Sequence, residues 1–215
     1  MTTNTAVLLV DPLNDFLHPD GKLYASIEAS LQDTQGIHHM KEVILAARKA
    51  EIPIFYGLHQ PFRDGAFFGW KHMTPSNQRV EKLHLFEEKW GGKILEGLEP
   101  DPANGDVIVS RHWNSSAFQN TDLSLQLRQR EITHLVIAGL TTNTCVESTA
   151  RYARELGYHV TLISDASVAF SLKLQEAARE VWPLLGDVKT TGEWVASLGV
   201  RGCNVLNATE TKEDA

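Results

Sequence analysis

The stretch HLVIAGLTTNTCVESTARYA, residues 134–153, joins an apolar run to a helical pattern through a polar turn. Residues 134–140 have the length and the β-branched content of a buried strand. From Val146 to Leu156 the apolar residues recur at helical spacing, and Gly157 closes the pattern as a C-terminal cap. A buried strand followed directly by a helix predicts an α/β fold.

The same alternation of strand and helix continues along the chain. Further apolar runs predict strands at 6–10, 52–58, 106–110 and 159–164, with a possible short sixth strand at 187–191. Helical patterns lie between and after them, around 37–47, 123–127 and 174–185. The alternation predicts a three-layer α/β/α Rossmann-like fold with a central parallel sheet of five or six strands.

One segment, residues 59–105, interrupts this alternation and is rich in aromatic residues, glycine and proline. Long irregular insertions of this kind are usually lids, binding loops or interface arms. Its aromatic side chains must bury against this chain or a neighbouring subunit, and we expect a homo-oligomer, either a dimer or a tetramer. We expect one domain over residues 1–204 and a polar tail over 205–215.

The composition, with 42% hydrophobic and 22% charged residues, is that of a soluble globular protein. The net charge of −7 argues against nucleic acid and against an anionic membrane as partners. The cysteines, Cys145 and Cys203, have no framework spacing, which fits a reducing compartment. The N-terminus lacks the basic segment of a signal peptide, so we expect a cytoplasmic protein. We also expect its substrate to be a small molecule.

Chemically active side chains follow three of the predicted strands. Asp11 follows the first strand, Arg111 and His112 follow the third, and Cys145 lies in the turn after the fourth. Ligands of open α/β sheets bind beyond the carboxyl ends of the strands, where these side chains would meet. A thiol, a base and a positive charge are what covalent acyl transfer requires. No glycine-rich dinucleotide fingerprint follows the first strand, and we expect no cofactor.

The position of Cys145 alone allows two interpretations. Thr144 and Glu147 have the spacing of a capping box, which would make Cys145 the first helical residue, beside unpaired amides and the positive end of the helix dipole. That field would favour the nucleophilic thiolate. A free cysteine is also among the most buried residue types and is usually inert.

Two stretches decide between these interpretations by resemblance. AVLLVDPLNDF at 6–16 and the segment at 115–170 resemble the cysteine hydrolases of the isochorismatase-like superfamily, and 59–105 matches least. The resemblance implies that Asp11 is the acid/base residue and Cys145 the nucleophile. It also implies an oxyanion hole made of the backbone amides of Thr141 and Cys145, with a cis peptide bond between residues 140 and 141.

The third member of the family's catalytic triad is a lysine, and this chain has none at the matching place. Counting back from the segment SAF at 116–118 reaches Arg111 or His112. We favour Arg111, because a guanidinium is permanently charged and could neutralise the site, although it cannot exchange a proton as a lysine might.

Some relatives, the nicotinamidases, bind a metal through an aspartate and histidines after the second strand. Here His59 is present, but Gly57 stands where the aspartate would be, so we predict no catalytic metal and expect His59 to line the pocket. Further substrate-binding candidates are Phe16, Trp70, His112 and Trp113.

The isochorismate ether hydrolases often lack the cysteine, so Cys145 indicates cleavage of a C–N bond, in an amide or a ureido group, through a thioester. Three alternatives stay open: an isochorismatase-type ether hydrolase, a thiol redox or sensor protein, and a binding protein that has lost catalysis with the lysine. For the redox alternative no resolving partner is evident, since Cys203 lies far along the chain.

Overall fold

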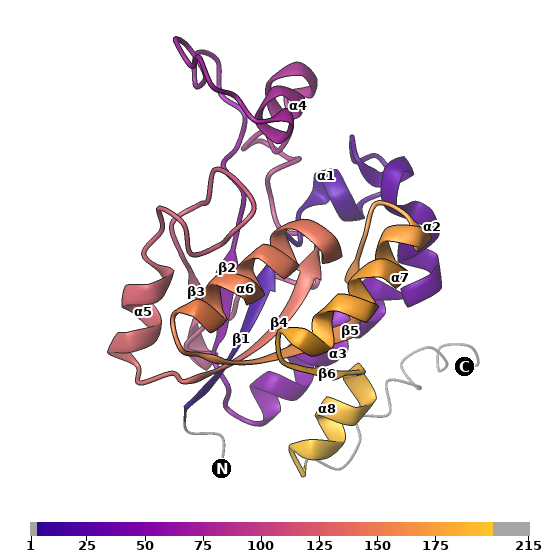
Figure 1. Ribbon diagram of the computed structural model, residues 1–215, viewed down its shortest axis with the longest axis vertical. Coiled ribbons are helices and arrows are strands. Elements are labelled where there is room, and N and C mark those ends of the chain that lie inside the picture. Colours follow the sequence, from indigo (N-terminus) through magenta and orange to yellow (C-terminus); the bar gives the residue numbers. More distant parts are fainter. Residues whose placement is uncertain (1–3, 200–215) are drawn as a thin grey trace, which may run out of the picture.

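The protein is built on a six-stranded parallel sheet with the strand order β3-β2-β1-β4-β5-β6 (Figure 1). The computed structural model describes residues 4–199. The strands are β1 Thr5–Val10, β2 Ile54–Gly57, β3 Val107–Ile108, β4 His134–Leu140, β5 His159–Val168 and β6 Asp187–Lys189. The predicted parallel sheet and its sixth strand are confirmed, but β3 is much shorter than the expected 106–110.

Helices cover both faces of the sheet (Figure 1). Their bounds are α1 Asn14–Leu17, α2 Tyr24–Thr34, α3 Gly36–Lys49, α4 Pro75–Leu83, α5 Leu123–Gln129, α6 Glu147–Glu155, α7 Leu172–Val181 and α8 Thr191–Ser197. The sequence patterns miss α1, α2, α4 and α8, which are short or bury few apolar side chains. In α4, for example, only Asn77 and Val80 are buried.

Alternate residues of β1 belong to two separate hydrophobic cores, which fixes the three-layer arrangement. Val7 and Leu9 pack with residues of α2, α3 and α8. Ala6, Leu8 and Val10 pack with residues of α5, α6 and α7 on the other side of the sheet. Because successive side chains of a strand point to opposite faces, an uninterrupted apolar run is what a strand buried on both faces requires.

Gly139 allows the two central strands to approach each other below the candidate site. Its φ is +116°, and an added Cβ would lie 2.1 Å from the Val10 carbonyl oxygen. The chain beyond this position leads directly into the turn that carries Cys145, so the site rests on a contact that only glycine permits.

We therefore expect Gly139→Ala to lower the free energy of unfolding by about 3 kcal/mol or more, because backbone cannot move aside as a flexible side chain would. Gly192→Ala is the matched control, since nothing lies within 4 Å of its added Cβ. Urea unfolding of both variants measures the difference. Equal stability of the two variants would contradict the close approach of β1 and β4.

The insertion at 59–105 contains α4, which lies beyond the carboxyl ends of the strands (Figure 1), and its last residues return to the amino end of β2, where the Asn104 side chain donates to the Ile52 carbonyl at 3.0 Å. Asp15, which is fully buried, fastens it to the segment after β1. The Asp15 Oδ2 accepts from the Phe86 backbone N–H at 2.5 Å, and the Asp15 N–H donates to the Gly91 carbonyl at 3.0 Å. The predicted tail at 205–215 lies outside the described residues.

The aromatic side chains of the insertion are divided between core and surface. Phe67 and Phe86 are buried, whereas Phe68 is 92% exposed and Trp70 is 41% exposed. Of the expected burial against this chain or a neighbouring subunit, the part within this chain is seen for Phe67 and Phe86. Among the helices of residues 4–199, none has the length and apolar character needed to cross a membrane.

Candidate active site

A cavity of about 280 Å³ lies beyond the carboxyl ends of the central strands. The sheet reverses its order between β1 and β4, and ligands of open α/β sheets bind at such a switch point. The side chains from the strand ends that line the cavity are those of Asp11, His59, Thr141, Thr144 and Cys145. The insertion contributes Pro75, Ser76, Arg79, Val80, Leu85 and Phe86.

Asp11 lies at the switch point with its carboxylate almost fully buried. Its φ of +49° turns the chain sharply at the end of β1. Oδ1 accepts a hydrogen bond of 2.6 Å from the His59 backbone N–H and lies 3.3 Å from His112 Nε2. Oδ2 has no hydrogen-bond partner among the described residues. One carboxylate oxygen is thus held in place, and the other remains available.

His112 is the cation beside Asp11. Its Nδ1–H donates to the Asn114 carbonyl at 2.5 Å, and its Nε2 faces the carboxylate. Burial alone would lower the pKa of His112, but the charge and hydrogen bond of Asp11 raise it above the ordinary value. Burial alone would raise the pKa of Asp11, but His112 and His59 lower it. Both partners are therefore charged near neutral pH.

His59 is neutral, in contrast to His112. Burial, followed by the charge of His112, lowers the pKa of its imidazole. Since the Gln60 carbonyl can only accept, the contact of 2.8 Å with His59 Nδ1 places the ring proton on that nitrogen. His59 therefore serves Asp11 through its backbone N–H while its ring lines the cavity.

Arg111, the residue favoured from the sequence, does not make the contact with Asp11. Its guanidinium donates to the His59 carbonyl at 2.7 Å and to the Gly92 carbonyl at 3.0 Å. The close ion pair with Asp11 is made by His112, whereas Arg111 acts on Asp11 only through the field of its charge. The physical reason is that β3 ends at Ile108, so strand alternation no longer determines which of residues 111 and 112 points inward.

Cys145 lies in a π-helical turn, Thr142–Val146, that precedes α6. The expected capping box is absent, because Glu147 pairs with Arg151 and the Thr144 hydroxyl lies against that of Thr141, 3.8 Å from the Cys145 sulfur. The Leu140–Thr141 peptide bond is cis, as the resemblance implies.

The Cys145 thiol is shifted toward its protonated form, which is opposite to the effect that a helix start alone would have. Burial, followed by the charge of Asp11, raises its pKa. The sequence shows the local helix start, but it does not show the carboxylate that the pairing of β1 with β4 brings to the same place. A base next to the thiol is then required for nucleophilic attack.

Some of the residues predicted to bind substrate line the cavity, and others do not. Phe16 and His59 line the cavity, whereas Trp70, Trp113 and His112 do not belong to the described residues that line it. Trp70 and Trp113 contact each other, with ring centroids 5.2 Å apart. Lining residues absent from the sequence-based prediction are Leu23, Thr144, Ser115, Phe170 and the insertion residues named above. The polar sequence of α4 gives no signal that its first turns line a cavity.

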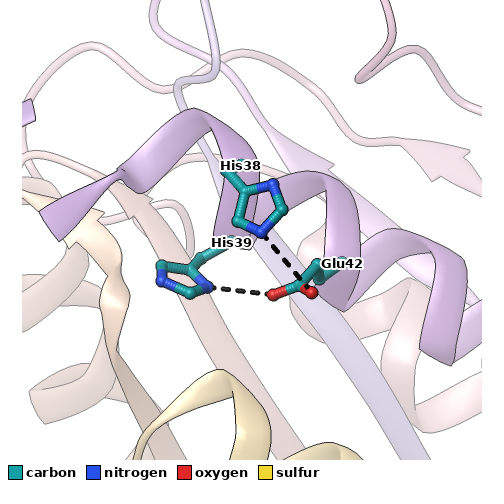
Figure 2. A group of neighbouring side chains, drawn as sticks. All are labelled: His38, His39 and Glu42. Carbon is teal, nitrogen blue, oxygen red and sulfur yellow. Dashed lines mark hydrogen bonds and ion pairs between the residues drawn. The ribbon is translucent and has the colours of Figure 1, made fainter. Parts of the chain in front are cut away.

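One group of side chains in residues 4–199 has the composition and closeness of a metal site: His38, His39 and Glu42 on α3 (Figure 2). The two oxygens of Glu42 pair with the two imidazoles, at 3.5 Å from His38 and 3.0 Å from His39. The second nitrogen of His39 lies 3.7 Å from Asp165 of β5. None of these residues is among those that line the cavity.

The fold is that of a known hydrolase class, as comparison with known proteins shows. Residues 5–191 match the Isochorismatase domain family. The chain is 30% identical over 210 residues to the ureidoacrylate amidohydrolase RutB of Caulobacter segnis, covering 91% of this chain and 86% of that protein. The protein belongs to the isochorismatase family.

Solved structures show the same fold. A cysteine hydrolase from Pseudomonas syringae pv. phaseolicola superimposes with a TM-score of 0.77 at 28% identity, covering 93% of this chain and 94% of that one. The N-carbamoylsarcosine amidase from Thermoplasma acidophilum has a TM-score of 0.65 at 20% identity, covering 87% and 96%. The second likeness concerns the fold alone.

Proposed function

We propose that the protein hydrolyses a C–N bond of a small amide or ureido compound, with Cys145 as the nucleophile and Asp11 as the acid/base residue. One observation carries the proposal: a buried, ionised carboxylate has one oxygen fixed by His59 and His112 and the other without a partner, in the cavity lined by a protonated thiol. The ureidoacrylate amidohydrolases among the relatives support the choice of a C–N bond.

In the proposed reaction, Asp11 takes the proton from the Cys145 sulfur as the sulfur attacks the carbonyl carbon. The backbone N–H groups of Thr141 and Cys145 hold the resulting oxyanion, and each such donor contributes about 3 kcal/mol in known oxyanion holes. Asp11 then gives its proton to the leaving nitrogen, the C–N bond breaks, and a thioester remains on Cys145.

Water completes the cycle. Asp11, again a carboxylate, takes a proton from a water molecule that attacks the thioester carbon, and the sulfur leaves as a thiol when it receives that proton. The proton taken from the thiol leaves with the amine, and the proton taken from water restores the thiol, so the charge of the site is the same at the end as at the start. Both the formation and the hydrolysis of the thioester require a base that is ionised at neutral pH and lies next to the reacting sulfur.

His112 has a supporting part in this proposal, as the positive charge that keeps Asp11 ionised. Arg111 is a positioning residue, because it joins the backbone of His59 to Gly92 of the insertion. In this proposal the charge of the family's lysine is thus supplied by the imidazolium of His112.

We expect His112→Gln to move the acid limb of the kcat/KM profile upward by about one to three pH units. Activity requires ionised Asp11 and is lost as pH falls through the pKa of Asp11. Removal of the His112 charge leaves burial to raise that pKa, so activity is lost at a higher pH. Arg111→Gln is the matched control and should move the limb much less. The opposite ranking would restore the assignment of this role to Arg111.

The proposed reaction is tested by release of ammonia or amine from a panel of small ureides and amides, with mass analysis of quenched samples for an acyl group on Cys145. An ether hydrolase would instead cleave isochorismate without an adduct. A redox protein would form a disulfide between Cys145 and Cys203 on treatment with peroxide; Cys203 lies outside the described residues. A binding protein would turn over no compound in the panel.

We further propose that residues 1–204 form one domain and that the protein is a cytoplasmic homo-oligomer. The exposed aromatic side chains of the insertion, Phe68 and Trp70, support the assembly, because large apolar side chains at a surface favour association. The molar mass in solution, measured by light scattering, tests it.

A further inference from the structure

The cavity has a single cationic side chain of arginine or lysine among the described residues that line it, that of Arg79 on α4. The guanidinium carbon lies 5.1 Å from the centroid of the Phe170 ring, and Nη2 lies 3.5 Å from the Ser26 hydroxyl. Within residues 4–199 no carboxylate forms an ion pair with Arg79. Arg79 is itself an exposed residue, so its guanidinium is accessible to a ligand in the cavity that it lines.

The first turn of α4 adds to the positive potential at this place. Pro75 and Ser76, the first two residues of the helix, line the same cavity, and Arg79 follows one turn later on the same face. The N-terminus of a helix carries a partial positive charge that favours anions. The chain as a whole has a net charge of −7, so the region formed by Arg79 and the start of α4 is opposite in sign to the overall charge.

The negative charge of the cavity lies elsewhere, at Asp11 among the strand ends. A substrate anion is repelled from Asp11 and attracted to Arg79, so the two charges give the cavity a polarity. A molecule with a carboxylate at one end and an amide or ureido group at the other would place its reacting carbonyl at Cys145. A cavity of about 280 Å³ is near the lower end for small-molecule sites and suits a compound of that size.

We propose that Arg79 binds the carboxylate of the substrate, and that the protein selects amides or ureides with a carboxylate remote from the bond that is cleaved. A guanidinium presents paired N–H donors in the geometry of a carboxylate, which an aliphatic cation does not. The inference rests on the proposed function for the identity of the reacting group, but binding of the carboxylate can be tested without turnover.

The first experiment measures binding to the Cys145→Ala variant by calorimetry, with 3-ureidopropionate and with butylurea, its uncharged counterpart. We expect 3-ureidopropionate to bind at least about tenfold more tightly, which is the size of a hydrogen bond to a charged group. Adding Arg79→Met should remove this preference, and Arg79→Lys should retain part of it. Lys82→Met, which removes a charge from the same helix outside the cavity, should leave it unchanged.

Several results would overturn the inference. These are equal binding of the two probes, no binding of either, an unchanged preference in Arg79→Met, or an equal loss in Lys82→Met, which would indicate a general effect of charge. In the enzyme with Cys145 intact, Arg79→Met should raise KM for the carboxylated probe by about tenfold with little change in kcat. If the carboxylate preference is present in binding but neither probe is hydrolysed, the proposed reaction fails and the role of Arg79 stands.

Discussion

Cys145→Ala is expected to abolish hydrolysis, with a loss of turnover of at least about a thousandfold, while the protein keeps its fold. The substitution removes the sulfur that forms the thioester in the proposed reaction. It takes away one small side chain, and the Thr144 hydroxyl, 3.8 Å from its sulfur, keeps its contact with the Thr141 hydroxyl. Turnover is measured by ammonia release, and the fold by thermal melting.

The matched control is Cys203→Ala, which keeps the proposed nucleophile. Full activity of this variant, with an acyl adduct still found on Cys145, would also exclude a redox pair of the two cysteines as the basis of function. Retained turnover in Cys145→Ala would instead remove the covalent mechanism and leave Asp11 to activate water directly.

Asp11→Asn is expected to lower turnover by about a thousandfold, because an amide can neither take the thiol proton nor protonate the leaving nitrogen. The reactivity of Cys145 toward iodoacetamide should change in the opposite sense. After burial, the charge of Asp11 is the next cause that raises the pKa of the thiol, so its removal lowers that pKa. The midpoint of alkylation against pH should move downward in the variant while hydrolysis fails.

This divergence separates two descriptions of the site. If Asp11 only kept Cys145 in its thiolate form, turnover and the alkylation of Cys145 would both fall in Asp11→Asn. If Asp11 transfers protons, turnover falls while alkylation becomes easier. The double variant Asp11→Asn/His112→Gln is the control for burial of an unpaired imidazolium, and it should fold with a stability closer to the wild type and remain inactive. Normal turnover in Asp11→Asn would place the base elsewhere.

The Asp11–His112 pair also makes stability depend on pH at both ends. The pKa of Asp11 is lowered by folding, so its contribution is lost as pH falls through that folded value. The pKa of His112 is raised, so its contribution is complete below the unfolded pKa and is lost as pH rises through the folded one. The stability that the pair contributes is therefore complete at pH values between the unfolded-state pKa of Asp11 and that of His112.

The central strands and the residues at their ends can be predicted from the sequence because each signal is local. The apolar runs of β1 and β4 are continuous, and Asp11 and Cys145 follow them directly. Arg111 and His112 could not be ranked, because β3 is only Val107–Ile108 and its alternation ends before them.

Neither the protonation state of Cys145 nor the place of α4 in the cavity wall could be predicted from the sequence. In both cases the cause is contacts between residues that lie far apart in the chain. The first depends on Asp11, which reaches the thiol through the pairing of β1 with β4. The second depends on how a polar helix is anchored, through contacts such as that of Asp15 with Phe86, separated by 71 positions in the chain. Patterns within a short window carry neither kind of information.

The cavity is enclosed by two parts of the chain that are built in different ways. Its inner side consists of strand ends held by the sheet, whereas its outer side belongs to an insertion fastened by a few contacts, such as those of Asp15 and Arg111. The reaction and the choice of substrate can therefore change independently in evolution. Substitutions in the insertion would change which compounds fit, while the residues at the strand ends stay the same. For an engineer, the lining residues between Pro75 and Phe86 are the part to vary, whereas the backbone at His59 has to be kept because its N–H holds Asp11.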